Sequence, residues 1–416
     1  MSGPVRGSAL AEPTRSVSKV WVVWLSLISV GVWSGFFGPI QVLLAQQAEA
    51  IDPANKETAL AIVLFGGALV STVLNPVWGA FSDRTVLRVG RRVPWVVGGL
   101  VGAVVAMLVL SRADSILQLA LGWAMAQGAL NAMLAAITAT VPDQVPARQR
   151  GGVGGWLAIA QTVGVVAGSG IADATGSIAA GYLTMAVSLV VLSLPYLLDN
   201  RDIPLAPEDR EPFDLGRFVR SFWVSPRQHP DFAWAWITRF LMNLGNALVI
   251  LYLLYYLKDA VDLTDDEAEH GVLLLTAAYG LCTVLTAVVG GIWSDRLGRR
   301  KVFVIASGLV AASALLLLAF VTTWAGAFAG AVILGIGFGI YTAVDFAMIT
   351  QVLPTAEGRA KDLGVINIAN ALPQVLAPGV AAVVLGLGFG YSTLYVLAAG
   401  FSVLGSVLVV KIKSLA

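Results

Sequence analysis

Long apolar runs separated by short polar breaks limit the fold of this 416-residue chain more than any other feature. A hydrocarbon layer of about 30 Å needs roughly 20 apolar residues of helix to cross it, and the runs have that length. Hydrophobic residues make up 57% of the chain and charged residues only 12%, a balance typical of a protein whose solvent is the bilayer. The predicted spans are 20–46, 58–81, 94–111, 115–140, 152–172, 177–198, 231–257, 270–293, 302–320, 324–350, 364–387 and 390–410.

The same runs argue against a membrane β-barrel. Barrel strands alternate apolar and polar side chains over segments of about ten residues, whereas these runs are longer and apolar on nearly all sides. An α-helix also pairs its backbone groups within one segment, as lipid requires. We therefore predict an all-α integral membrane protein with twelve transmembrane helices.

Positive charge is distributed unevenly across the predicted membrane. Of the 26 Lys and Arg residues, all but four fall in the tails and breaks on one side; the exceptions are Lys56, Arg112, Lys258 and the intramembrane Arg239. Lys and Arg mark cytoplasmic segments, so both termini are predicted to be cytoplasmic. The first 18 residues lack a signal-peptide pattern, so the first span is expected to stay uncleaved in the plasma membrane.

An internal repeat divides the chain. The segment Gly79-Ala80-Phe81-Ser82-Asp83-Arg84 recurs as Gly291-Ile292-Trp293-Ser294-Asp295-Arg296, and Gly90-Arg91-Arg92 recurs as Gly298-Arg299-Arg300. Duplication of a six-helix unit accounts for both matches. The predicted organisation is a cytoplasmic tail at 1–19, a six-helix bundle at 20–198, a cytoplasmic linker at 199–230 and a second six-helix bundle at 231–411.

Part of the linker has helical periodicity. Leu215, Phe218 and Phe222 share one face of a helix over 213–223. This pattern favours a short helix on the inner membrane surface. An ordinary loop containing aromatic residues is the alternative.

The repeated loop suggests a family. Its second copy, Gly291-x-x-x-Asp295-Arg296-x-Gly298-Arg299-Arg300, resembles the signature loop of the major facilitator superfamily, and the first copy matches with four extra residues. The resemblance implies the major facilitator fold, secondary transport, and a loop that latches the cytoplasmic side when the carrier opens outward. It assigns this latch to Gly79, Asp83, Arg84, Gly90, Arg91, Arg92, Gly291, Asp295, Arg296, Arg299 and Arg300. The alternative, that the arginines only follow the positive-inside rule, leaves the recurring Asp unexplained.

The region from helix 2 to helix 3 carries a narrower resemblance. It is similar to the glycoside-pentoside-hexuronide cation symporters in the pattern Asn75-Pro76-x-x-Gly79-x-x-Ser82-Asp83-Arg84-Thr85-x-x-Arg88-x-Gly90-Arg91-Arg92-x-Pro94-Trp95. This similarity implies a sugar-like substrate. The two helix 2 carboxylates that form the cation site of those symporters are replaced here by Ser71 and Asn75, so we predict neither sodium coupling nor a metal site.

Two ionisable side chains fall well inside the predicted spans, Arg239 and Asp345. A charge at that depth costs about 2.5–3.5 kcal/mol even on the gentler insertion scales, so each needs a partner or a water-filled cavity. Both lie on helices that line the central cavity in the family. We predict that they pair near the cytoplasmic gate and that Asp345 is the candidate for proton coupling. A static ion pair between two helices is the alternative.

Neutral polar side chains recur at helical spacing on the four helices that the resemblance places around the cavity. Amides beside a Trp or Tyr ring suit a hydroxylated solute. The predicted substrate-binding residues are Trp33, Gln41, Gln127, Asn131, Asn243, Asn246 and Tyr341. Polar side chains also hold membrane helices together, and that interpretation is at least as good for Ser71 and Asn75 on helix 2 and for Asn367, Asn370 and Gln374 on helix 11.

Three tyrosines, Tyr252, Tyr255 and Tyr256, cluster near the predicted outer end of helix 7. Tyr and Trp are enriched where a membrane meets water. This position favours an interfacial belt.

The sequence thus predicts a secondary active transporter of a small sugar- or glycoside-like solute that works by alternating access with protons as the expected coupling ion. Export of drug-like or secondary metabolites is the alternative, and a non-transporting sensor or assembly factor is a minor one. The chain lacks a Gly-x-x-x-x-Gly-Lys-Ser/Thr loop, and His229, His270 and Cys282 are too dispersed for catalysis. We expect a monomer in contact with membrane lipid, without catalytic residues, cofactor or nucleic-acid partner.

Overall fold

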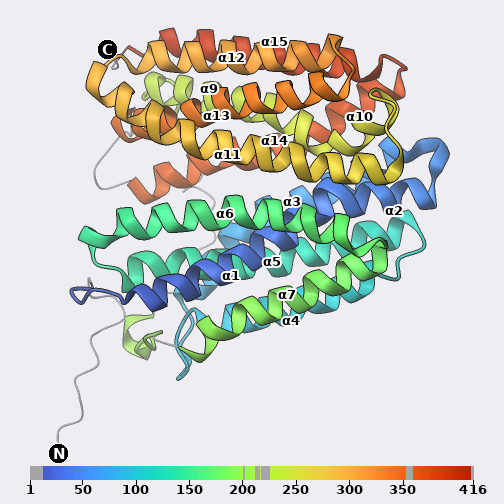
Figure 1. The fold of residues 1–416 in the computed structure, drawn as a ribbon. Coiled ribbons are helices and arrows are strands. Elements are labelled where there is room, and N and C mark those ends of the chain that lie inside the picture. The colour runs from blue at the N-terminus through green and yellow to red at the C-terminus, as the bar shows by residue number, and fades with distance from the viewer. Residues whose placement is uncertain (1–12, 200–201, 211–215, 217–224, 353–358, 414–416) are drawn as a thin grey trace, which may run out of the picture. The chain divides into compact units, whose positions relative to one another are not determined.

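The structure, a computed structural model, describes residues 13–199, 202–210, 216, 225–352 and 359–413. All regular secondary structure in these residues is helical, without a strand (Figure 1). Twelve of its helices are long and apolar enough to cross a membrane. The predicted all-α fold with twelve spans is therefore confirmed. Most of the segment for which an amphipathic helix was predicted, 213–223, lies outside the described residues.

The chain divides into two compact units. The first comprises Met1–Asp52 and Gly66–Pro212. In it α1 packs against α6 and α7, and α4 packs against α5. Its elements are α1 (Lys19–Gly38), the π-helical turn η1 (Pro39–Leu43), α2 (Leu44–Ile51), most of α3 (Lys56–Asp83), α4 (Val93–Leu110), α5 (Ile116–Gln144), α6 (Ala147–Thr175), α7 (Ile178–Leu198) and the short η3 (Pro207–Asp209).

The second unit comprises Phe213–Ala416 together with Pro53–Phe65, which includes the start of α3. In it α11 and α12 pack against α13, and α9 packs against α14 and α15. Its elements are η2 (Pro53–Asn55), α9 (Pro230–Leu251), α10 (Leu253–Asp259), α11 (Asp265–Leu297), α12 (Arg300–Phe320), α13 (Trp324–Val352), α14 (Arg359–Gly386), α15 (Gly390–Leu408) and η4 (Val409–Lys411).

Several helices begin at side chains that cap them. Ser18, Ser115 and Ser177 each accept a hydrogen bond from a backbone N–H in the first turn of α1, α5 and α7. Thr264 and Glu267 form a reciprocal capping box at the start of α11. These bonds satisfy donors that have no partner within the helix, so the short polar breaks of the sequence fix where the helices start.

One face of α4 turns apolar side chains outward, and the helix has small residues at helix contacts. Val101 and Val105 are exposed, whereas Ala103 and Ala106 are buried against neighbouring helices. A water-soluble protein would hide the valines. In lipid, by contrast, small residues at helix contacts let the backbones approach closely and the bilayer solvates the larger side chains.

The tyrosine cluster corrects one prediction. Tyr252, Tyr255 and Tyr256 are at most 1% exposed, so the predicted interfacial belt is wrong. The Tyr256 hydroxyl donates to the Leu318 carbonyl at 2.9 Å, and its ring lies 4.9 Å from that of Tyr395. These tyrosines pack between helices of the second unit. There a ring finds apolar and aromatic neighbours, and the hydroxyl of the same side chain finds a hydrogen-bond partner.

The crossing of α1 and α6 depends on glycine. A Cβ atom at Gly168 would lie 2.7 Å from the Gly38 nitrogen and 2.8 Å from the Ser34 carbonyl oxygen. Both neighbours are backbone atoms, which cannot rotate away. The two helices can therefore be this close only because residue 168 has no side chain.

We expect Gly168→Leu to lower the free energy of unfolding by about 1–3 kcal/mol, the usual cost of overpacking. Gly155→Leu on the same helix is the matched control, since a Cβ there would meet no atom within 4 Å. Thermal unfolding of the purified proteins in detergent measures the difference. Equal stability of the two variants would refute the close crossing.

Candidate functional site

The polar interior of the first unit is a network of neutral amides on α3 and α5. Gln127 and Asn131 lie on one face of α5, and the Asn131 amide donates to Gln127 Oε1 at 3.2 Å. The same amide donates to the Ser71 hydroxyl at 2.9 Å, and Asn75 donates to Asn131 Oδ1 at 2.9 Å. Asn131, which is 3% exposed, is thus held on both sides of its amide. The network therefore joins Gln127 and Asn131, which were predicted to bind substrate, to Ser71 and Asn75. For the latter two, helix packing was an equally good interpretation of the sequence.

Trp33 and Gln41 lie on the first span, in α1 and η1. The Trp33 ring is half-buried beside Phe36 and Phe37, with centroids 5.9 Å and 6.0 Å away. Gln41 is buried, and its Oε1 accepts a 2.5 Å hydrogen bond from the Ser169 hydroxyl on α6. Gln41 belongs to the π-helical turn η1, whose wider spacing shifts the helical face that the sequence assigned to it.

The polar interior of the second unit contains the predicted ion pair. Arg239 Nη1 on α9 lies 2.9 Å from Asp345 Oδ2 on α13, and Asp345 is 2% exposed. Arg239 Nε also donates to Asn370 Oδ1 on α14 at 2.7 Å, and that oxygen accepts from Asn243 at 3.2 Å. A buried charge pair is stable only with such extra hydrogen bonds. Three helices therefore meet at one guanidinium.

Two oxygen atoms lie beside the pair on α13, Asp345 Oδ1 and the Tyr341 hydroxyl, one helical turn apart on the same face. The two groups interact with each other, and neither atom has another hydrogen-bond partner within the described part of the chain. Buried polar atoms are nearly always satisfied, so these two mark a place for an incoming donor or acceptor.

An aromatic row extends the site toward α11. The ring of Tyr341 lies 5.8 Å from that of Phe338, which lies 6.2 Å from that of Tyr279. The Tyr279 hydroxyl donates to Asn246 Oδ1 at 3.2 Å. Asn246 therefore has a partner on α11, which the sequence did not indicate. Amides and aromatic rings thus lie together on this side of the unit, an arrangement suited to a solute with hydroxyl groups and a flat apolar face.

The first copy of the loop motif (residues 79–92) is built around buried arginines. Arg91 and Arg92 are 6% and 3% exposed. Asp143 at the end of α5 forms ion pairs with both: Arg91 Nη2 lies 2.6 Å from its Oδ1, and Arg92 Nε lies 2.7 Å from its Oδ2. Arg92 Nη2 also contacts Asp83 Oδ1 at 2.6 Å. The repeat in the sequence indicated Asp83. It gave no sign of Asp143, which lies 52 and 51 positions after Arg91 and Arg92.

The linker supplies a third carboxylate to this motif. Asp202 Oδ2 accepts hydrogen bonds from the backbone N–H of Arg92 at 2.5 Å and of Val93 at 3.0 Å, and so caps α4. Gly90 has φ +115°, and a Cβ atom there would collide with the Asp202 carboxylate. The motif therefore requires glycine at this position for two independent reasons.

Burial and hydrogen bonding shift the pKa values of Asp202 and Arg92 in opposite directions. Burial raises the pKa of the Asp202 carboxyl above its ordinary value, and the two backbone hydrogen bonds oppose that shift. For Arg92, burial alone lowers the pKa, but the hydrogen bond and charge of Asp143 raise it above its ordinary value. Arg92 therefore stays charged.

Two further residues of the first copy lie at the end of α3. Arg84, which directly follows α3, donates from Nη1 to the Ala80 carbonyl of that helix at 2.8 Å. A Cβ atom at Gly79 would meet nothing within 4 Å.

The second copy of the motif (residues 291–300) differs in its contacts. Arg296 and Arg299 are exposed, Arg300 is half-buried, and the side chain of Asp295 lies outside the described part of the structure. Gly298 ends α11 with φ +64°, and a Cβ at Gly291 would lie 3.6 Å from Ala343 Cβ. Arg299 therefore has no ion pair among the described residues, unlike its counterpart Arg91, which pairs with Asp143.

Twelve helices long and apolar enough to span a membrane, with polar clusters inside each unit, indicate a multi-pass membrane protein. The family model described as Major Facilitator Superfamily matches residues 23–274 and 240–414. Since the two matches cover nearly the whole sequence, the chain belongs to the major facilitator superfamily and is a secondary transporter.

Solved structures of transporters share this fold. The chain is similar to a mutant of the nucleoside transporter NupG, with a TM-score of 0.77 and 12% identity over 95% of this chain and 99% of that one. A POT family transporter in complex with 5-aminolevulinic acid gives 0.76 and 15% over 94% and 96%. A bacterial homologue of the human lysosomal transporter Spinster gives 0.65 and 14% over 95% and 96%. Comparison with curated proteins found no match. The similarity to the glycoside-pentoside-hexuronide symporters stays a prediction.

The role of Asp202 can be tested through the two amides that it caps. We expect Asp202→Ala to speed hydrogen exchange at Arg92 and Val93 by roughly two- to thirtyfold, the usual range for a lost cap. Asp202→Asn should retain most of the protection, because Asn keeps an acceptor oxygen and burial already disfavours the charge. Hydrogen–deuterium exchange followed by mass spectrometry of the peptide around residue 92 measures both variants. Unchanged exchange in the alanine variant would refute the cap.

Proposed function

We propose that this transporter carries a small hydroxylated solute of the sugar or glycoside class by alternating access, and that protons acting at Asp345 drive it. One observation carries the proposal. The buried Asp345 carboxylate contacts Arg239 through one oxygen, and its second oxygen has no partner among the described residues other than the neighbouring Tyr341 hydroxyl, one turn away.

A proton on Asp345 changes how the helices of the second unit are held. Protonation turns the contact with Arg239 from an ion pair into a neutral hydrogen bond and weakens the link between α9 and α13. Arg239 keeps its bond to Asn370 in either state. One proton thereby alters the balance between two arrangements of the site, as coupling requires.

The neutral groups around the pair favour a hydroxylated solute. Asn243 and Asn246 on α9 offer amide groups, and Tyr341 offers a phenol beside the aromatic row. Hydroxyl groups can both donate to and accept from such side chains. A nucleoside is itself a glycoside, so the likeness to a nucleoside transporter is compatible with this substrate class.

Alternating access and membrane orientation complete the proposal. Two six-helix bundles that move against each other about a central site are the general design of such carriers. The distribution of Lys and Arg supports a plasma-membrane protein with both termini in the cytoplasm.

A ligand screen tests the substrate class. We expect sugars, glycosides or nucleosides to raise the unfolding temperature of the purified protein, because a ligand at a hundredfold excess over Kd stabilises by about 2.7 kcal/mol. Asn243→Ala should weaken that stabilisation. Differential scanning fluorimetry against sugars, nucleosides and lipophilic cations measures it. Stabilisation by lipophilic cations alone would favour an exporter and refute the sugar class.

The coupling role can be tested in proteoliposomes with the solute found in the screen. We expect Asp345→Asn to lose proton-driven accumulation at least about tenfold while retaining exchange of labelled for unlabelled solute, because exchange needs no net proton movement. Asp262→Asn is the matched control, since Asp262 is exposed and its φ of +63° suits Asn equally well. Wild-type accumulation in Asp345→Asn would contradict the proposal.

A double variant separates coupling from structure. Removing one partner of a buried pair leaves an uncompensated charge that costs about 3–5 kcal/mol, so Asp345→Asn is expected to unfold at a lower temperature. Arg239→Gln with Asp345→Asn removes both charges and should recover stability without recovering accumulation. If the double variant accumulates solute with the proton gradient, the pair is only structural.

A further inference from the structure

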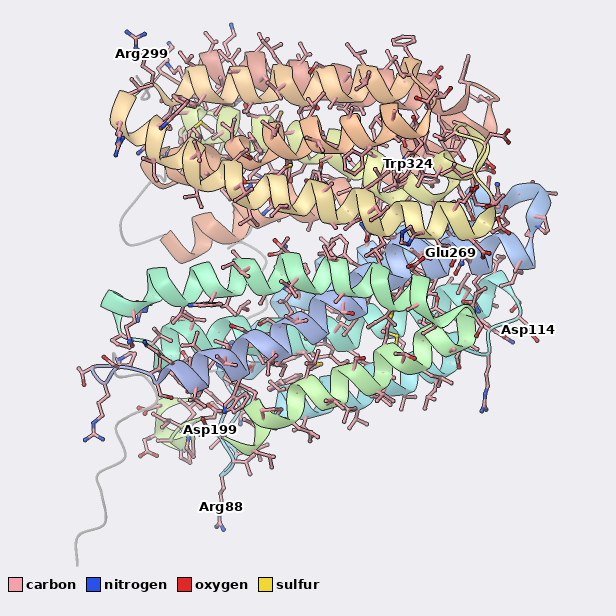
Figure 2. The ribbon with its side chains drawn as sticks, in the orientation of Figure 1. Arg88, Asp114, Asp199, Glu269, Arg299 and Trp324 are labelled. Atoms are coloured by element: carbon pink, nitrogen blue, oxygen red, sulfur yellow. The ribbon has the colours of Figure 1, made fainter. Side chains whose placement is uncertain are left out.

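The connection between α11 and α12 is strongly basic. Its four cationic residues within six positions are Arg296, Arg299, Arg300 and Lys301. Arg296 and Arg299 are exposed, and Figure 2 shows the Arg299 side chain extending outward from the end of the helices. From residue 296 to the end of α12 the chain has no acidic residue.

The C-terminal segment adds two cations at the same end of the unit. Val409 and Ile412 pack with Val304 of α12 in one buried cluster. Lys411 and Lys413, which alternate with these residues, are exposed. The buried cluster thus holds the two lysines next to the start of α12. We call the six cations Arg296, Arg299, Arg300, Lys301, Lys411 and Lys413 the basic end.

Among the described residues, no carboxylate forms an ion pair with the exposed arginines of the basic end, Arg296 and Arg299. Arg91, the counterpart of Arg299 in the first copy, is buried against Asp143. The positive-inside rule requires basic residues in such a connection but does not require them to stay unpaired, since the first copy obeys the rule with paired arginines.

Apolar side chains surround these cations on the outer surface of the helices. Trp293, Leu297 and Val302 are 58%, 63% and 56% exposed. Such side chains at the end of a membrane span face acyl chains, and Trp prefers the depth of the lipid head groups. The cations therefore lie at the depth where phosphate groups are found.

We propose that the basic end binds the head groups of anionic phospholipids in the leaflet that it faces. Guanidinium groups can donate two parallel hydrogen bonds to one phosphate, and clusters of four to eight cations beside a span attract anionic lipid. The exposed apolar side chains receive the acyl chains of the same lipids. This interaction does not depend on which solute is carried.

The test compares lipid binding by the full chain and two charge-neutralised variants. Arg296→Gln with Arg299→Gln removes two cations of the basic end. Arg88→Gln with Arg112→Gln removes two exposed cations elsewhere and is the matched control. Each purified protein is titrated with phosphatidylglycerol, with phosphatidylcholine and with soluble glycerol phosphate, and bound lipid is counted by native mass spectrometry beside the thermal shift.

We expect phosphatidylglycerol to bind and stabilise the wild type more than phosphatidylcholine does. Each cation near an anionic surface contributes roughly fivefold to affinity, so the Arg296 and Arg299 variant should bind about 25-fold more weakly. The control pair should stay close to wild type, and the variant should remain folded because both residues are exposed. Equal loss in both pairs, or no preference for phosphatidylglycerol, would overturn the proposal. Full stabilisation by glycerol phosphate would indicate a free-phosphate site and overturn it as well.

Discussion

A hydrocarbon interior offers no water to satisfy a polar group, and this constraint orders the rest of the molecule. The backbone meets it by forming helices, which are capped where they leave the membrane by residues such as Ser115 and Thr264. Polar side chains meet it by bonding to one another, around Asn131 in the first unit and around Arg239 in the second. The directional bonds that a hydrophilic solute needs are therefore gathered inside the two units.

The two units share a repeated motif but differ in where they hold charge. The first has neutral amides inside and buries Arg91 and Arg92 against carboxylates in its loop. The second has the Arg239–Asp345 pair inside and leaves Arg296 and Arg299 of its loop exposed. Titration and anion binding both require a charge whose environment can change. On this chemistry, we propose proton coupling for the interior of the second unit and lipid binding for its loop.

The sequence predicted the features that are set by residue spacing along a single helix. Hydropathy gave the twelve spans, and the depth of Arg239 and Asp345 along their helices predicted their pairing. It could not predict Asn370 as the second acceptor for Arg239, or Asp143 and Asp202 as partners of the first loop motif. Those contacts join segments that periodicity treats separately. The predicted interfacial belt of Tyr252, Tyr255 and Tyr256 was wrong for a related reason. Interfacial tyrosines and tyrosines that pack between helices have the same spacing in the sequence.

The sequence by itself determined the solvent, the spans, the duplication and the family, because each follows from the identity and spacing of residues along the chain. Only the tertiary structure decided which polar atoms are satisfied and which are left available. One Asp345 oxygen is left without a bond to Arg239, because Arg239 also bonds to Asn370 and contacts only the other oxygen. Arg91 is buried and its counterpart Arg299 is exposed, because a carboxylate from a distant helix reaches Arg91, whereas no described ion pair reaches Arg299. Hydrogen bonds and ion pairs act over a few ångströms in space, and sequence separation does not encode that distance.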